Sequence, residues 1–168
     1  MGFEQRFKNG LGKLYSLEEL QKLCADSGKY PYQDVTTSFL DGENWKEYPY
    51  LENLKSQYSE NDYRGREYHK INEMYVSDMG RVKIVYNDES GLKKEEILGQ
   101  IDDLEGGYLR LPKYPGFGNV YRLVADTWLE PLEGKNIVHH IDNNGYNNRA
   151  INLIWVDNKE HGLIHGFK

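Results

Sequence analysis

Histidine is concentrated at one end of this chain. Four of its five histidines, His139, His140, His161 and His165, lie within the last thirty residues. On a helix, residues four apart such as His161 and His165 lie on one face, which lets two imidazoles bind one metal ion. His139 could supply a third ligand if such a helix packed back on the strand that carries it. The spacing therefore predicts a C-terminal metal site with an open position for water or substrate.

Composition excludes several other classes of protein. The 168 residues are enough for one ordinary domain, or for one small domain with appendages. The single cysteine, Cys24, excludes an intrachain disulfide framework and every cysteine-rich zinc finger. No apolar run approaches the roughly 20 residues of a membrane span, and the first ten residues lack the core of a signal peptide. We therefore expect a cytoplasmic protein with no membrane partner.

Local patterns predict an α+β protein built from short elements. Ser16 and Glu19 form a capping-box pattern at the start of a helix over residues 17–25. The other predicted elements, in chain order, are strands 74–77 and 80–86, a hairpin of 108–111 with 119–121, a helix over 122–129, strands 136–141 and 151–156, and a helix over 158–167. The histidines thus fall on a strand–loop–strand–helix segment.

The loop of that segment, residues 142–150, is rich in Asn and Asp. These side chains hydrogen-bond to nearby backbone groups and tolerate left-handed conformations, so such a loop can be rigid without an apolar core. Rigidity beside a catalytic histidine would hold a general base in place.

Two motifs resemble known families. The run HHID-x-N-x-x-NN-x-x-x-NL, followed by EH-x-x-x-H, closely resembles the HNH nucleases of the ββα-metal class, and the resemblance covers residues 107–168. The segment 75–82, read as Y-V-S-x-x-G-x-V, is similar to the NUMOD-type module that precedes HNH domains in phage intron-encoded homing endonucleases. Residues 1–65 contain no motif that we can assign to a known family. The resemblance implies three parts: an N-terminal, partly helical region of unknown role (1–65), a NUMOD-like antiparallel β module (66–106) and a C-terminal ββα-metal finger (107–168).

The resemblance also implies residue roles. His140 would be the general base, and Asn152 would brace the loop so that His140 is oriented. His139 and His161 would hold the metal, with His165 as a further ligand, as in colicin-type nucleases.

The identity of the metal stays open. Many homing relatives carry Asp and Asn where this chain has His139 and His161, and they favour magnesium. Imidazole ligands favour softer ions, so the candidates for the one divalent ion are zinc, nickel and manganese as well as magnesium.

The function implied is a metal-dependent endonuclease or nickase acting on double-stranded DNA, associated with a phage or mobile element, in a bacterial host or phage-infected cell. Arg149 and Arg122 are the candidate phosphate contacts. The net charge of −6 does not exclude DNA, because residues 107–168 hold seven Lys or Arg against six Asp or Glu and the acidity lies elsewhere.

The alternative is a non-catalytic, metal-stabilised DNA-binding or structural module. The sequence leaves open which DNA sequence is the target and whether one strand or both are cut. It also leaves open whether the role is homing, restriction or packaging, and what the oligomeric state is.

Overall fold

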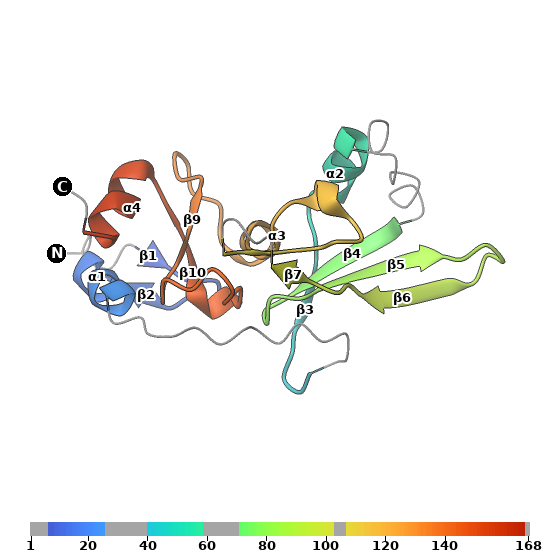
Figure 1. Ribbon diagram of the computed structural model, residues 1–168, viewed down its shortest axis with the longest axis horizontal. Coiled ribbons are helices and arrows are strands. Elements are labelled where there is room, and N and C mark those ends of the chain that lie inside the picture. Colours follow the sequence, from blue (N-terminus) through green and yellow to red (C-terminus); the bar gives the residue numbers. More distant parts are fainter. Residues whose placement is uncertain (1–6, 26–39, 59–70, 103–106, 167–168) are drawn as a thin grey trace.

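The computed structural model describes residues 7–25, 40–58, 71–102 and 107–166. This part of the chain contains four α-helices and several small antiparallel sheets, which confirms the predicted α+β class. The molecule is elongated (Figure 1): the histidine-bearing segment and residues 7–25 share one end, and a four-stranded sheet forms the other.

The C-terminal segment consists of two antiparallel strands and a helix. Strand β9 (Ile137–His140) pairs with β10 (Leu153–Val156), with His139 opposite Ile154. The short 3-10 helix η4 (Ala150–Asn152) leads into β10, and α4 (Asn158–Ile164) follows it. The predicted strands and final helix are therefore present, although each is shorter than expected.

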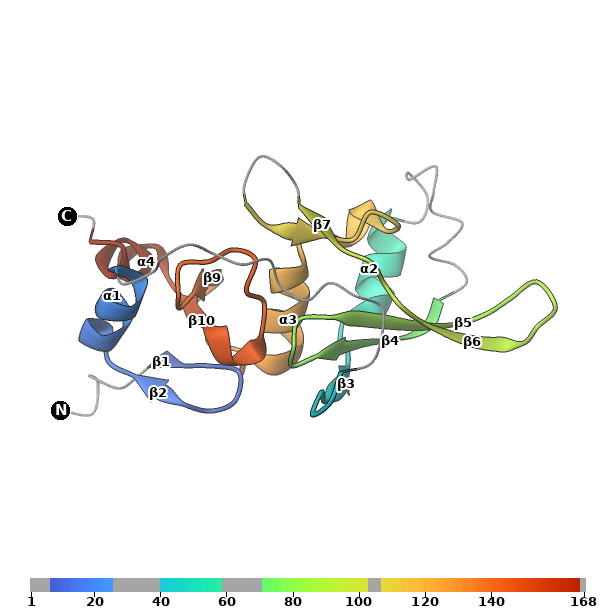
Figure 2. The same ribbon diagram turned by 60° about the horizontal axis from the view of Figure 1, so that its bottom comes forward.

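Helix α3 (Val120–Trp128) packs against this segment and against the four-stranded sheet, as Figure 2 shows. The predicted strand over residues 119–121 is wrong, because the helix already begins at Val120. Val120, Leu123 and Val124 are all buried, and their spacing has the period of a helix rather than that of a strand. Of the predicted hairpin, only an isolated bridge between Arg110 and Asn119 forms.

The N-terminal elements cover the C-terminal segment. Strands β1 (Phe7–Lys8) and β2 (Leu14–Tyr15) form a small hairpin that lies beside β10, and α1 (Leu17–Ala25) lies beside α4. The predicted helix and its capping box are confirmed, since Glu19 N donates to Ser16 Oγ and Ser16 N donates to Glu19 Oε1. These elements share one buried apolar cluster, which consists of Phe7, Tyr15, Leu20, Cys24, Ile141, Ile154, Val156 and Ile164.

The other end is an antiparallel sheet in the order β3 (Trp45–Glu47), β4 (Ile71–Ser77), β5 (Val82–Asn87), β6 (Lys93–Ile97). Residues 74–77 and most of 80–86 lie in β4 and β5, as predicted. Helix α2 (Leu51–Tyr58), the strand pair β7 (Ile101–Asp102) and β8 (Leu109–Arg110), and the 3-10 helix η3 (Pro115–Phe117) complete this part.

The turn between β4 and β5 reaches the Asn-rich loop and so helps to position the site. Ala150 N donates to Asp78 O at 2.9 Å. Gly80 has a φ of +78°, and a Cβ atom there would lie only 2.9 Å from Asn148 O. Position 80 therefore requires glycine for two reasons: the backbone conformation and the close approach of the loop.

Candidate metal centre and adjacent cavity

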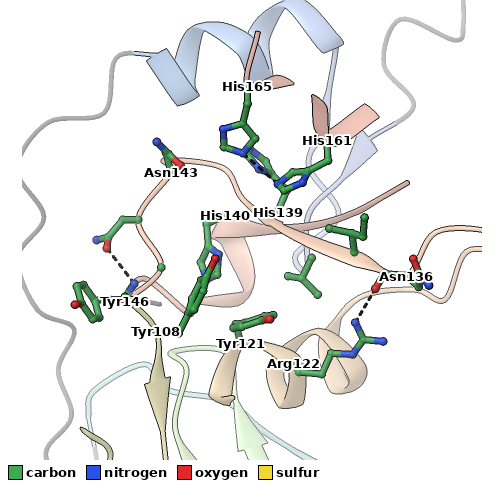
Figure 3. Close-up of a pocket in the computed structure, with 15 residues that line it drawn as sticks. Tyr108, Tyr121, Arg122, Asn136, His139, His140, Asn143, Tyr146, His161 and His165 are labelled. Atoms are coloured by element: carbon green, nitrogen blue, oxygen red, sulfur yellow. Dashed lines mark hydrogen bonds between the residues drawn. The ribbon is translucent and has the colours of Figure 1, made fainter. Parts of the chain in front are cut away.

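Three histidines converge at the junction of β9 and α4. His139 projects from β9, His161 lies on α4, and His165 lies one turn further at its C-terminal end. One ring nitrogen from each lies within 4.8 Å of the others, and Figure 3 shows the three rings grouped together. The structure therefore brings together the three predicted metal ligands.

The protonation of two histidines of this cluster, His139 and His161, suits a metal ion. Burial, with His165, His161 and His140 close by, lowers the pKa of His139 to about 3. Burial and the neighbouring His165 also lower the pKa of His161. These rings are therefore neutral near pH 7, and a neutral imidazole is the form that binds a metal.

One buried nitrogen has no protein partner in the described part of the chain. His139 is 2% exposed, and its Nε2 is buried without a hydrogen bond. A buried polar atom without a partner is costly unless something else satisfies it. A divalent cation at the cluster would do so, and a set of three imidazoles with no carboxylate fits zinc, nickel or manganese better than magnesium.

The cluster opens onto a cavity of about 660 Å³. Its walls include the four C-terminal histidines, three tyrosines (Tyr108, Tyr121 and Tyr146) and Arg122. If the three histidines held an ion, the open cavity beside them would leave room for water and substrate at that ion, which is the arrangement of catalytic rather than structural metal sites.

His140 lines the same cavity but has different neighbours from His139, because adjacent residues on a strand point to opposite faces. Its ring stacks on Tyr108 at 5.8 Å between centroids and meets Tyr121 edge-on at 5.3 Å. His140 is 7% exposed, and burial lowers its pKa below the ordinary value. Because its pKa is lowered, the ring is neutral near pH 7. The two tyrosines pack against it and hold it in one orientation.

Asn148 is the hydrogen-bond partner of His140, with its Oδ1 at 2.9 Å from Nε2. Asn148 is itself buried against the turn at Gly80. Sequence reasoning did not single out Asn148, Tyr108 or Tyr121. The Asn-rich composition of the loop was the only signal for Asn148, and it does not say which amide faces the histidine.

Asn152 lies at the base of the loop and braces it. Its Oδ1 accepts from Asp142 N at 3.1 Å, and its Nδ2 donates to Asp142 Oδ1 and to Asn147 O, each at 2.9 Å. Asn152 thus ties the two ends of the loop together, and it has no hydrogen bond to His140 among the described residues.

The two arginines predicted to contact phosphate have different surroundings. Arg122 lines the cavity and donates from Nη1 to Asn136 O at 2.7 Å, with its guanidinium over the Trp155 ring. Arg149 is exposed just before η4 and is not part of the cavity wall.

Comparisons of the chain with protein-family models, curated proteins and solved structures found no match. In the described part of the chain, no helix has the length and apolar character needed to cross a membrane.

Proposed function

We propose that this chain is a metal-dependent endonuclease or nickase that hydrolyses DNA phosphodiester bonds, and that residues 137–165 form its ββα-metal site. One observation carries the proposal: His139, His161 and His165 converge on one point beside His140, and all four line one cavity. The resemblance of the histidine and asparagine spacing to HNH nucleases supports the same conclusion. The association with a phage or mobile element, in a bacterial cell, rests on that resemblance.

His140 is the general base of the proposed reaction. With Asn148 Oδ1 as the acceptor, Nε2 of His140 carries the proton and Nδ1 is the free basic nitrogen. The lowered pKa keeps that nitrogen unprotonated near pH 7, so it can take a proton from the attacking water. Asn148 and the two tyrosines keep the ring in place for this transfer.

His139, His161 and His165 would hold the ion. A divalent cation bound there supplies charge stabilisation for the scissile phosphate and for the leaving oxygen. Arg122, at the cavity wall, and Arg149, on the surface nearby, are the proposed contacts to the phosphates of double-stranded DNA.

A plasmid-nicking assay tests the proposal. The full chain is incubated with supercoiled DNA and, in separate arms, magnesium, manganese, zinc or nickel, with a chelator control. We expect at least one ion to support nicking or linearisation, and the chelator to abolish it.

The variant His140→Ala should lose cleavage while its metal content stays that of the wild type. Lys159→Ala, at an exposed position on α4, is the matched control and should cleave normally. Loss of the bound metal in His140→Ala would place His140 among the ligands and contradict its role as base.

A second candidate is a non-catalytic, metal-stabilised DNA-binding or structural module. The low exposure of His140 and its packing between two tyrosines favour it, because a well-packed histidine can be purely structural. Stoichiometric metal binding without cleavage of any DNA form would establish this second function and exclude the first.

A further inference from the structure

The thiol of Cys24 touches a proposed metal ligand. Cys24 Sγ lies 3.4 Å from Nδ1 of His165, although the two residues are 141 positions apart in the chain. The other nitrogen of the same ring, Nε2, lies 3.1 Å from Nε2 of His161, inside the histidine cluster. His165 therefore has one nitrogen toward the cluster and the other toward the N-terminal helix.

Helix α1 holds this thiol in a fixed place. Gln21 Nε2 donates to Leu163 O at 2.8 Å, which ties α1 to the backbone of α4. Leu20 and Cys24 are buried with Ile164 in the apolar cluster that the two helices share. In Figure 3, α1 is the pale blue helix near His165. A side chain fixed by packing on both sides can orient the ring that it contacts.

The contact between Cys24 and His165 bears on which nitrogen of the His165 imidazole carries its proton. A neutral imidazole carries one proton, so His165 can bind a metal through Nε2 only when the proton is on Nδ1. Nδ1–H then needs an acceptor, and Cys24 Sγ is within reach. When no metal is bound, the thiol can instead donate its proton toward Nδ1, and Nε2–H of His165 can donate to Nε2 of His161. A thiol can fill both roles because it is a weak donor and a weak acceptor.

We propose that α1 is a part of the metal site and that Cys24 is the positioning residue that orients His165 for metal binding. The inference rests on the metal site of the proposed function. A second observation points to a ligand at the same place: Nε2 of His139 is buried and has no hydrogen-bond partner among the residues that the structure describes. Cys24 is not itself one of the three clustered ligands. Residues 17–25, for which the sequence indicated no role, thus support the C-terminal site.

Zinc affinity of the full chain, measured by competition with a chelator and without DNA, tests the proposal. Loss of a partner that orients a metal ligand typically weakens binding about 10- to 100-fold. Because a thiol is a weak partner, we expect Cys24→Ala to weaken zinc binding about 10-fold, at the low end of that range. Cys24→Ser should recover part of the loss, since a hydroxyl can also donate and accept.

The matched control is Gln21→Ala. It removes a hydrogen bond between α1 and α4 but leaves Cys24 in contact with His165. This variant loosens the docking of α1 but keeps the thiol, so we expect it to weaken zinc binding less than Cys24→Ala does. Equal weakening in Gln21→Ala and Cys24→Ala would mean that only the docking of α1 matters and would overturn the role of Cys24, as would wild-type affinity in Cys24→Ala.

Two spectroscopic readouts complete the test. Imidazole ¹⁵N spectra of the zinc-loaded wild type should show the proton of His165 on Nδ1, and the metal-free spectra of wild type and Cys24→Ala should differ at that ring. Identical metal-free spectra would overturn the contact, and a sulfur-to-metal charge-transfer band with cobalt would make Cys24 a direct ligand instead. If zinc binding depends on Cys24 but no DNA is cleaved, the nuclease proposal fails and the role of Cys24 stands.

Discussion

His139 and His140 are adjacent in the chain, yet their rings have different neighbours. His139 faces the imidazoles of α4, whereas His140 contacts Asn148 and two tyrosines. The alternation of side chains along β9 separates the two roles, so that one histidine can bind a metal while the next stays free to accept a proton. The doublet therefore places the two proposed roles, metal ligand and general base, on adjacent residues.

Asn148→Ala tests how His140 is oriented. The substitution removes the acceptor of Nε2, which frees the ring to turn and its proton to move. Displacement of a catalytic group by about 1 Å can cost about 10²-fold in rate, and we expect a loss of that order in nicking kinetics with unchanged metal affinity. Ile151→Ala, at a position 49% exposed in the same segment, is the control. A wild-type rate in Asn148→Ala would show that His140 does not depend on this partner.

Away from the site, Arg81 and Glu43 form a buried ion pair. Arg81 Nε donates to Glu43 Oε2 at 2.8 Å and Nη2 donates to Oε1 at 2.6 Å, and both side chains are almost fully inaccessible. Burial raises the pKa of the Glu43 carboxyl, but hydrogen bonds from Arg81, Ser77 and the backbone of Leu40 outweigh it and hold the pKa below its ordinary value. The pair ties residues 40–43 to the turn between β4 and β5.

Glu43→Gln should therefore destabilise the fold in a pH-dependent way. Because the folded pKa is lowered, the stabilisation is fully present above the ordinary glutamate pKa of about 4.3 and is lost as the pH falls through the folded value. Removing one partner of a buried pair costs about 3–5 kcal/mol. Urea unfolding should show a loss of this size at pH 7 and a smaller difference from wild type near pH 3. The exposed Glu47→Gln should show neither effect.

At the scale of the elements, α4 carries the proposed ligand His161 and ends at the proposed ligand His165, and its first turn is held by a capping box. Glu160 N donates to Asp157 Oδ1 at 2.8 Å, and Asp157 N donates to Glu160 Oε1 at 3.0 Å. Glu160 also accepts from Lys135 Nζ at 2.6 Å. A helix of seven residues depends on such end contacts, because it has few hydrogen bonds of its own.

Asp157→Ala should weaken both the helix and the metal site. Loss of an N-cap costs about 0.5–2 kcal/mol, and fraying of the first turn would loosen His161. We expect a lower free energy of unfolding by chemical denaturation, together with weaker zinc binding. Asn158→Ala, one residue further and exposed, is the comparison. If both variants bind zinc equally well, the cap does not support the site.

At the scale of the whole molecule, each apolar core combines residues that are far apart in the sequence. Residues 7–24 share a core with residues 141–164, while the main core joins the four-stranded sheet to α3, Val138 and Leu153. The histidine cluster lies where β9 and α4 meet, and both elements also contact the rest of the fold. Metal binding should therefore stabilise the fold as well as the site.

Chelation should lower the melting temperature of the full chain. An ion present at 100 times its Kd stabilises the folded state by about 2.7 kcal/mol. For a protein of this size each kcal/mol corresponds to about 2–4 °C, so we expect a shift of about 5–11 °C. Calorimetry with and without chelator measures it, and His161→Ala should show little shift. An unchanged wild-type melt would mean that metal binding and folding are uncoupled.

Local patterns were sufficient to predict much of the fold and the proposed ligand set. The helix over residues 17–25 follows from its capping box and apolar period, and the C-terminal strands and helix follow from theirs. The strand predicted over residues 119–121 is wrong because a short apolar run fits a strand and the start of a helix equally well. His139, His161 and His165 could be named as a set because helical spacing and a strand doublet are both features of the sequence itself.

The sequence by itself determined the element types around the site and the residues able to bind a metal, since these depend on neighbours within a few positions. Only the tertiary structure decided that Asn148 faces His140, that Tyr108 and Tyr121 enclose the ring, and that Cys24 contacts His165 from 141 residues away. Such contacts depend on how the surfaces of separate elements pack, and no local periodicity encodes which remote side chain will lie there.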